Sequence, residues 1–304
     1  MAKYAVIDIG TNSIKFHVAE KNDHGKWSVV VDRAEIVRLG EGLQKTGEIS
    51  SEAMTRNVQA IEDMVKEAKK MGVESIAAVG TMALRTARNA DKFVEKVRQQ
   101  SGVIIEILPG DEEARLSYQA VKSGMELADS KLAVYDIGGG STEFILGEGD
   151  SIQKKFSLNI GAVRFTEEYL KSDPVTEEEY QQAVQAIEEA LDGLIFEEKV
   201  NKLVGVGGAM TNLSAIKHKL PVYDSDIIQG SQLSLSDLKK QIELFKSKTI
   251  AERKQIIGLQ PERADVILAG AIIVMIILKK AEVDFVTISD RGLRHGLIID
   301  RFGD

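Results

Sequence analysis

Two short glycine turns, each preceded by an aspartate, have the residue types and spacing that could do chemistry. The first is Asp-Ile-Gly-Thr-Asn-Ser at 8–13, and the second is Asp-Ile-Gly-Gly-Gly-Ser at 136–141. In both, glycine and small residues let backbone N–H groups turn toward an anion, so that phosphate can approach the main chain. An aspartate beside phosphate is unfavourable unless a cation stands between them. The turns therefore predict phosphate binding, with Asp8 and Asp136 near a divalent cation, most plausibly Mg²⁺.

The two turns belong to an internal repeat. Residues 5–20 (AVIDIGTNSIKFHVAE) and 133–148 (AVYDIGGGSTEFILGE) lie 128 positions apart and are identical at eight of sixteen positions. A single turn of this kind is also explained as an ordinary hairpin, where Gly and Asn are common. Two matching turns at equivalent positions favour a pair of phosphate loops. Because Lys15 occupies the position of Glu143, we expect the two loops to have different roles.

A third glycine motif follows in the second half of the chain. Residues 203–216 (LVGVGGAMTNLSAI) have the pattern of a strand, then Gly207 and Gly208, then a helix. The N-terminus of a helix favours anions, because its first N–H groups and the helix dipole point toward them. We expect this pair of glycines to contribute to the same phosphate site.

Strands alternate with helices in both halves of the sequence. This order predicts an α/β fold of two domains, each with a mixed sheet flanked by helices. The start of the second repeat places the boundary between 127 and 128, giving domains 1–127 and 128–304, and the last helix could pack back on the first domain.

The composition excludes several classes of protein. With 304 residues and a net charge of −8, the chain is unsuited to broad binding of nucleic acid or anionic membranes. Its longest apolar run, 266–278, is thirteen residues, whereas a membrane span needs roughly 20; we expect a buried core helix and no membrane role. The chain has no cysteine and hence no thiolate metal site. The four histidines, His17, His24, His218 and His295, show no metal-ligand spacing. We expect a cytoplasmic protein.

The paired loops resemble those of the actin-like ATPase superfamily, in which two similar, ribonuclease H-like domains hold phosphate in the cleft between them. Within that superfamily the chain is similar to the exopolyphosphatase/guanosine pentaphosphate phosphohydrolase family over nearly its whole length. The similarity is carried, in order, by the strings at 79–93 (VGTMALRTARNADKF), 107–121 (ILPGDEEARLSYQAV), 136–144 (DIGGGSTEF), 157–170 (SLNIGAVRFTEEYL) and 288–298 (ISDRGLRHGLI).

The resemblance implies roles for particular residues. Glu113 matches the family's general base, with Glu112 as the rival assignment, and Asp136 and Glu143 match its divalent-metal ligands; Asp8 is the third metal candidate. Arg85 matches a phosphate-contacting arginine. The predicted phosphate-binding set is Thr11, Asn12, Ser13, Lys15, Arg85, Gly138, Gly139, Gly140, Ser141, Thr142, Gly207 and Gly208. Four more arginines are open candidates: Arg88, which could equally be a surface residue, Arg115, which could pair with neighbouring acids, Arg291 and Arg294.

The resemblance implies a metal-dependent phosphatase that releases orthophosphate from the end of inorganic polyphosphate, and a homodimer. The nearest alternative is hydrolysis of guanosine pentaphosphate to the tetraphosphate. Longer family members carry a helical C-terminal extension, so a chain ending at Asp304 makes shorter polyphosphate or nucleotide more plausible. A kinase using ATP and a non-catalytic nucleotide-binding protein are the more distant alternatives.

Overall fold

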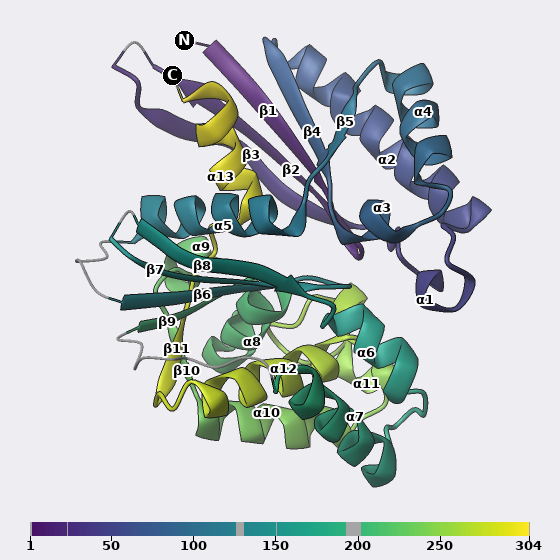
Figure 1. Cartoon of the computed structure of the whole chain (residues 1–304), viewed down its shortest axis with the longest axis vertical. Helices are drawn as coiled ribbons and strands as arrows, with labels where there is room; N and C mark the ends of the chain where they lie inside the picture. Colours follow the sequence, from purple (N-terminus) through teal and green to yellow (C-terminus); the bar gives the residue numbers. More distant parts are fainter. Residues whose placement is uncertain (1, 23, 126–130, 150, 193–201, 304) are drawn as a thin grey trace. The chain divides into compact units, whose positions relative to one another are not determined.

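The protein was analysed as a computed structural model, which describes residues 2–22, 24–125, 131–149, 151–192 and 202–303 (Figure 1). The chain forms two compact units. Unit 1 consists of Met1–Ala120 with Leu293–Asp304, and unit 2 of Val121–Gly292. The domain boundary that we predicted between 127 and 128 lies outside the described residues.

Unit 1 contains a mixed sheet of five strands. These are β1 (Ala2–Ile9), β2 (Ser13–Lys21), β3 (Trp27–Ile36), β4 (Ser75–Gly80) and β5 (Ile105–Ile107). Their order in the sheet is β3-β2-β1-β4-β5. β1 is antiparallel to β2 and parallel to β4, so that β1 occupies the centre of the sheet.

Both faces of this sheet are covered by helices. They are α1 (Leu43–Thr46), α2 (Ser51–Lys70), α3 (Met82–Thr86), α4 (Ala90–Ser101), α5 (Gly110–Gly124), whose last residues belong to unit 2, and α13 (Leu293–Phe302). Figure 1 shows α2 and α4 on one face and α13 on the other. Alternation along β1 explains this, since Ile7 packs in the core that contains α2, whereas Val6 packs with Leu293 and Leu297 of α13.

Unit 2 contains a mixed sheet of six strands. These are β6 (Lys131–Ile137), β7 (Thr142–Glu148), β8 (Ser151–Leu158), β9 (Lys202–Val206), β10 (Gln232–Ser234) and β11 (Phe285–Ile288). Their order is β10-β11-β9-β6-β7-β8. Apart from the added edge strand β10, this order and the strand directions repeat those of unit 1, so the repeat in the sequence is a repeat of structure.

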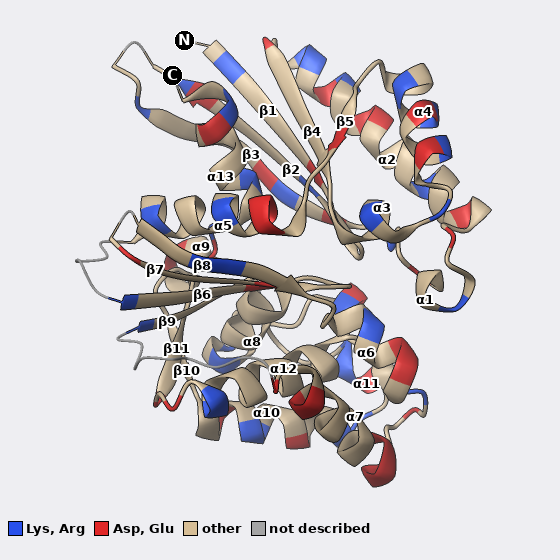
Figure 2. Ribbon diagram, in the orientation of Figure 1, with Lys and Arg blue, Asp and Glu red and all other residues tan. Residues whose placement is uncertain are grey.

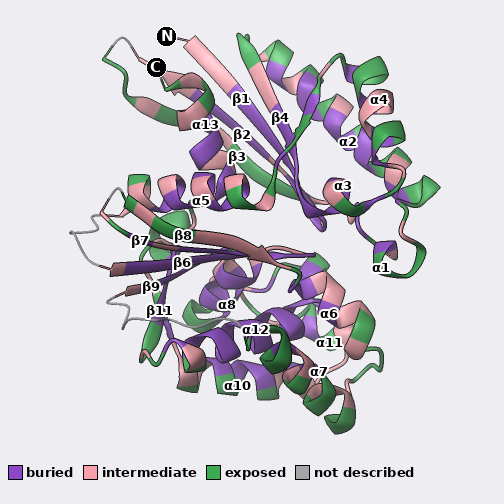
Figure 3. Ribbon diagram, viewed as in Figure 1, coloured by how far each residue is buried: buried purple, intermediate pink, exposed green. Residues whose placement is uncertain are grey.

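The helices of unit 2 pack against its sheet and against each other. They are α6 (Ala162–Tyr169), α7 (Glu177–Ala190), α8 (Gly208–His218), α9 (Ser225–Ile228), α10 (Leu235–Lys246), α11 (Ile250–Arg253) and α12 (Ile267–Lys280), with a 3₁₀ turn at Pro261–Arg263. The apolar run at 266–278 forms α12, and its residues from Ile267 to Leu278 are all buried, as Figure 3 shows for this helix. No helix in the described ranges is long and apolar enough to span a bilayer.

The sequence signals for helix ends agree with these elements. Ser50 caps α2 by accepting a hydrogen bond from the Ala53 N–H, and Ser234 caps α10 in the same way with Asp237. The predicted α/β fold, with mixed sheets flanked by helices, is confirmed.

Candidate active site

The two glycine turns have the same backbone geometry. In unit 1 the turn joins β1 to β2, and the Gly10 N–H donates to the Ser13 carbonyl at 3.0 Å. In unit 2 the turn joins β6 to β7, and the Gly138 N–H donates to the Ser141 carbonyl at 2.9 Å. Each turn therefore presents its two central residues at the tip of a hairpin.

The strand register places the charged residues of each hairpin opposite one another. Asp8 pairs with Lys15 across β1 and β2, and Asp136 pairs with Glu143 across β6 and β7. Residues directly opposite in an antiparallel pair project from the same face of the sheet. Lys15 Nζ lies 2.9 Å from Asp8 Oδ2, so an ammonium balances the acid in unit 1. In unit 2 the same register brings two carboxylates together.

The carboxylate of Glu143 is held by two hydroxyl groups. Ser141 Oγ and Ser157 Oγ each donate to Glu143 Oε1 at 2.7 Å. Ser157 was missed in the sequence analysis, although its place opposite Glu143 on the next strand could have indicated it. Asp136 and Glu143 are 7% and 1% exposed, so the two carboxylates are buried at the end of the hairpin.

The two hairpin tips offer hydrogen-bond donors. The Asn12 side chain is 7% exposed, and its Nδ2 has no hydrogen-bond partner among the described residues. In unit 2 the Gly138 and Gly139 carbonyls accept hydrogen bonds from the first turn of α6. These hydrogen bonds hold the carbonyl groups of the second hairpin tip against α6. The Thr142 hydroxyl, in contrast, donates to the Ile160 carbonyl at 2.5 Å, which gives it a structural bond.

Gly207, just before α8, lies beside Asp136. Its φ of 104° and ψ of 167° belong to a region of backbone conformation that only glycine readily adopts. A Cβ at Gly207 would lie 2.5 Å from the Ile137 carbonyl oxygen and 2.9 Å from Asp136 Oδ1. Gly207 therefore keeps space beside the Asp136 carboxylate.

Gly208 makes room for Arg263, a residue that the sequence analysis missed. A Cβ at Gly208 would lie 2.4 Å from the Arg263 guanidinium carbon. Burial lowers the pKa of Arg263 to about 10, which still leaves it charged at neutral pH, and its Nε donates to Gln260 at 2.8 Å. A buried positive charge thus lies at the N-terminus of α8.

Glu113 and Arg85 meet in unit 1. Arg85 Nη1 donates to Glu113 Oε2 at 2.7 Å and to the Leu108 carbonyl at 2.8 Å, and the two side chains are 11% (Glu113) and 18% (Arg85) exposed. Glu113 lies in the acidic first turn of α5 (Figure 2), where the helix dipole favours a carboxylate. Arg85 is in α3, whose first residue follows Thr81, and the Thr81 N–H donates to the Ile9 carbonyl beside the first glycine turn.

Glu112, the rival to Glu113, belongs to a different network. Arg115 donates to Glu112 at 2.6 Å and to Asp300 at 2.6 Å. Hydrogen bonding to Glu112, together with the contact to Asp300, outweighs the opposing effect of burial and raises the pKa of Arg115 above its usual range. Glu112 therefore takes part in an ion-pair network between α5 and α13.

The remaining arginine candidates have structural partners. Arg88 donates to the Thr46 carbonyl at 2.9 Å from a side chain that is 68% exposed. Arg291 Nη1 donates to the Ser123 carbonyl at 2.9 Å, and Arg294 forms an ion pair with Asp32.

The two mixed sheets, each with a glycine hairpin at the same place, define the chain as a protein of two actin-like units. The sequence pattern of the Ppx/GppA phosphatase family matches this chain over residues 17–303. The chain belongs to this family.

Three relatives differ in how much of their length the chain spans. It is 36% identical to the bifunctional 3-dehydroquinate synthase/phosphatase of Fusobacterium nucleatum, over 97% of this chain and 46% of that protein. It is 32% identical to exopolyphosphatase 2 of Mycobacterium tuberculosis, over 100% of this chain and 99% of that protein. It is also 32% identical to the guanosine-5'-triphosphate,3'-diphosphate pyrophosphatase of Photobacterium profundum, over 98% of this chain and 59% of that protein. The chain thus spans less than two thirds of the first and third relatives.

A solved structure supports the same family assignment. The crystal structure of the Aquifex aeolicus member of the Ppx/GppA family superimposes with a TM-score of 0.83 at 34% identity, covering 99% of this chain and 97% of that chain.

Proposed function

We propose that the protein is a divalent-metal-dependent exopolyphosphatase, which hydrolyses the terminal phosphoanhydride bond of inorganic polyphosphate and releases orthophosphate. The observation that carries the proposal is the change of one residue between two equal hairpins, from Lys15 opposite Asp8 to Glu143 opposite Asp136. This change provides a cation in one loop and a site for a cation in the other. A relative of almost equal length is named an exopolyphosphatase.

The side chains present at the second hairpin fit Mg²⁺ or another hard divalent cation. Asp136 and Glu143 supply carboxylate oxygens, which are the ligands that such ions prefer. Two buried carboxylates at one register position attract a cation. The Ser141 and Ser157 hydroxyls orient the Glu143 carboxylate, in the manner of groups that support metal ligands. When bound, the ion would neutralise negative charge on the phosphate oxygens. Asp8, which faces Lys15, stays a predicted ligand.

Glu113 is the residue that we assign as the general base. Its carboxylate would take a proton from the water that attacks the terminal phosphorus, while the bond from phosphorus to the bridging oxygen breaks and the shortened chain leaves. Arg85, which donates to the same carboxylate, would also contact phosphate oxygens through its guanidinium group. Glu113 pairs with Arg85, the predicted phosphate-contacting arginine, whereas Glu112 pairs with Arg115 in the network with α13; this difference favours Glu113 over Glu112 for the role.

The hairpin tips would bind the phosphate groups. Phosphoryl transfer to water depends mainly on positioning and on charge stabilisation, and needs no Ser or Cys nucleophile. Asn12 Nδ2 and Lys15 at the first tip, and the glycines at the second tip and before α8, offer donors or close backbone approach for this purpose.

The alternative substrate is guanosine pentaphosphate, which the same chemistry would convert to the tetraphosphate. A relative named for this kind of nucleotide supports it. The homodimer that the family resemblance implies and the cytoplasmic location expected from the composition stay predictions.

The test is orthophosphate release with Mg²⁺ from polyphosphates of several lengths, from guanosine pentaphosphate and from ATP. Removal of a general base lowers rates by about 10²- to 10⁴-fold, and we expect this loss for Glu113→Gln. Glu112→Gln is the matched control and should keep most of the activity. Equal rates for wild type and Glu113→Gln would refute the mechanism. Release only in the presence of a sugar or acid acceptor would favour a kinase.

A further inference from the structure

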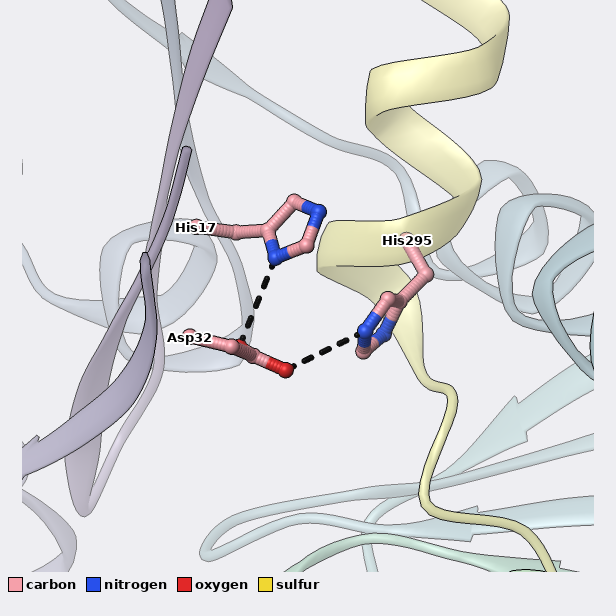
Figure 4. A group of neighbouring side chains, drawn as sticks. All are labelled: His17, Asp32 and His295. Carbon is pink, nitrogen blue, oxygen red and sulfur yellow. Dashed lines mark ion pairs between the residues drawn. The ribbon is translucent and has the colours of Figure 1, made fainter. Parts of the chain in front are cut away.

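Unit 1 contains a cluster of two histidines and one aspartate that the proposed reaction does not use. His17 comes from β2, Asp32 from β3 and His295 from α13, and Figure 4 shows their polar atoms converging on one another. His17 Nδ1 lies 3.5 Å from Asp32 Oδ1, and His295 Nε2 lies 3.2 Å from Asp32 Oδ2. The three ligand atoms lie within 4.8 Å of one another.

The fold brings these residues together from distant parts of the sequence. His17 and Asp32 are directly opposite in the β2–β3 pairing. His295 reaches them because α13 packs on this face of the sheet through Leu293 and Leu297. The rings of His17 and His295 are 4.7 Å apart between centroids. A ligand bound here would connect the C-terminal helix to the sheet.

One atom of the cluster lacks a hydrogen bond. His17 is 2% exposed, and its Nδ1 has no hydrogen-bond partner among the described residues. An unpaired polar atom in the interior is destabilising, because its hydration is lost without replacement. Nδ1 is directed toward Asp32 and therefore into the centre of the cluster (Figure 4). A cation bound between them would satisfy it.

The spacing suits a small ion. Metal–ligand distances of roughly 2.1 Å place the ligands of a tetrahedral ion roughly 3.4 Å apart. Two separations, 3.5 Å and 3.2 Å, are already close to this value. Burial, reinforced by the charge of Arg294, lowers the pKa of His295 to about 3, so its ring is neutral and can offer a lone pair at neutral pH.

We propose that His17, Asp32 and His295 form a binding site for a divalent transition-metal ion of the Zn²⁺ type. Two imidazoles and one carboxylate suit Zn²⁺, Co²⁺ or Ni²⁺, whereas Mg²⁺ prefers oxygen ligands alone. The site is distinct from the carboxylate pair of unit 2. Bound metal joins β2, β3 and α13 and stabilises unit 1 by mass action.

Arg294 is the competitor for this site. Its Nε and Nη2 donate to the two oxygens of Asp32 at 2.5 Å and 3.0 Å. An ion that binds Asp32 has to displace one of these contacts. Arg294→Gln, which removes the competing charge, is therefore expected to tighten metal binding about tenfold or more, since the charge-assisted hydrogen bonds that the ion would have to displace are among the stronger ones.

Metal binding can be measured directly, because no cysteine competes for the ion and the chain has four histidines. Metal-free protein would be titrated with Zn²⁺ by calorimetry and with Co²⁺ by visible absorption, in the presence of excess Mg²⁺. We expect one ion per chain and an absorption spectrum that is typical of Co²⁺ with a low coordination number. The double variant His17→Gln/His295→Gln should lose this binding. The double variant His24→Gln/His218→Gln, at two exposed histidines, is the matched control and should retain it.

A measurement on the wild-type protein tests the site without requiring that any variant folds correctly. Two-dimensional NMR of the imidazole nitrogens resolves four rings, and Zn²⁺ should shift the nitrogens of His17 and His295. No uptake of Zn²⁺ or Co²⁺, uptake that survives the His17/His295 double variant, or shifts confined to His24 and His218 would each overturn the proposal. None of these readouts depends on phosphatase activity.

Discussion

The stability of unit 1 should fall as pH falls below about 6.5, because His295 stays neutral when the protein is folded. Burial lowers its pKa from 6.5 to about 3, and the charge of Arg294 adds to this effect. The unfolded chain takes up a proton below pH 6.5 that the folded chain does not bind. Protonation then favours the unfolded state, and stability is lost progressively as pH decreases toward 3.

The size of this loss follows from the two pKa values. Each unit of pH within the window costs 1.36 kcal/mol, so the change from pH 7.5 to pH 5 amounts to about 2 kcal/mol. Asp32 does not contribute in this range. Burial would raise its pKa, but the contacts with His17, His295 and Arg294 outweigh burial and hold the pKa far below its usual value. Its contribution is present above pH 3.8 and is lost only below that value.

The chain contains a single reporter for this measurement. Trp27 is the only tryptophan, and it packs in unit 1 against Tyr4, with ring centroids 5.8 Å apart. Urea unfolding followed by Trp27 fluorescence, in the presence of EDTA, gives the free energy of unfolding of unit 1 at each pH. His295→Gln keeps a polar side chain near Asp32 but does not titrate.

The wild type should lose about 2 kcal/mol more than His295→Gln between pH 7.5 and 5. If the free energies of both proteins changed with pH in parallel, the inference that His295 is held neutral would be wrong.

Three further predictions test the site. Gly207→Ala should destabilise unit 2 by about 1–3 kcal/mol and impair phosphate release, because the new Cβ would press on Asp136 and on the Ile137 carbonyl. Unfolding curves and kcat/KM check this, and an unchanged kcat/KM would contradict it. Arg85→Ala should lower the free energy of unfolding by about 3 kcal/mol, because it removes the ion pair of a largely buried carboxylate. Arg88→Ala should change it by no more than about 0.5 kcal/mol. Equal losses for the two variants in urea unfolding would refute the comparison. Ser157→Ala should raise the Mg²⁺ concentration for half-maximal activity about 10- to 100-fold, since it removes one of the two hydroxyl groups that orient the Glu143 carboxylate. An unaltered Mg²⁺ titration would exclude that role.

The sequence was sufficient for features that are local or repeated. The match between 5–20 and 133–148 predicted two equivalent glycine loops, and in the structure both loops join strands with the same register and the same turn. Hairpin pairing is local, so residues seven positions apart across a short turn necessarily face each other. The burial of 266–278 followed from its length and uniform apolarity.

Tertiary structure decided which side chains meet across long separations in sequence. Glu112 and Glu113 are adjacent in sequence. The pairing of Glu112 with Arg115, three residues along the same helix, could be expected from the sequence, but only the packed elements show that Glu113 bonds Arg85, 28 positions away. Ser157 reaches Glu143 only because a third strand, β8, completes the hairpin sheet. Arg263 lies 55 positions beyond Gly208 in the sequence, yet it fills the space that this glycine leaves open.

The histidines show the difference most clearly. Spacing in the sequence gave no sign of a metal site, because His17 and His295 are 278 positions apart. The sequence determined the paired hairpins, their acids and the family, since these depend on short segments with a fixed period. Only the packing of α13 on the sheet of unit 1 joined the two ends of the chain into one cluster, because contacts between distant segments are set by which apolar faces bury one another.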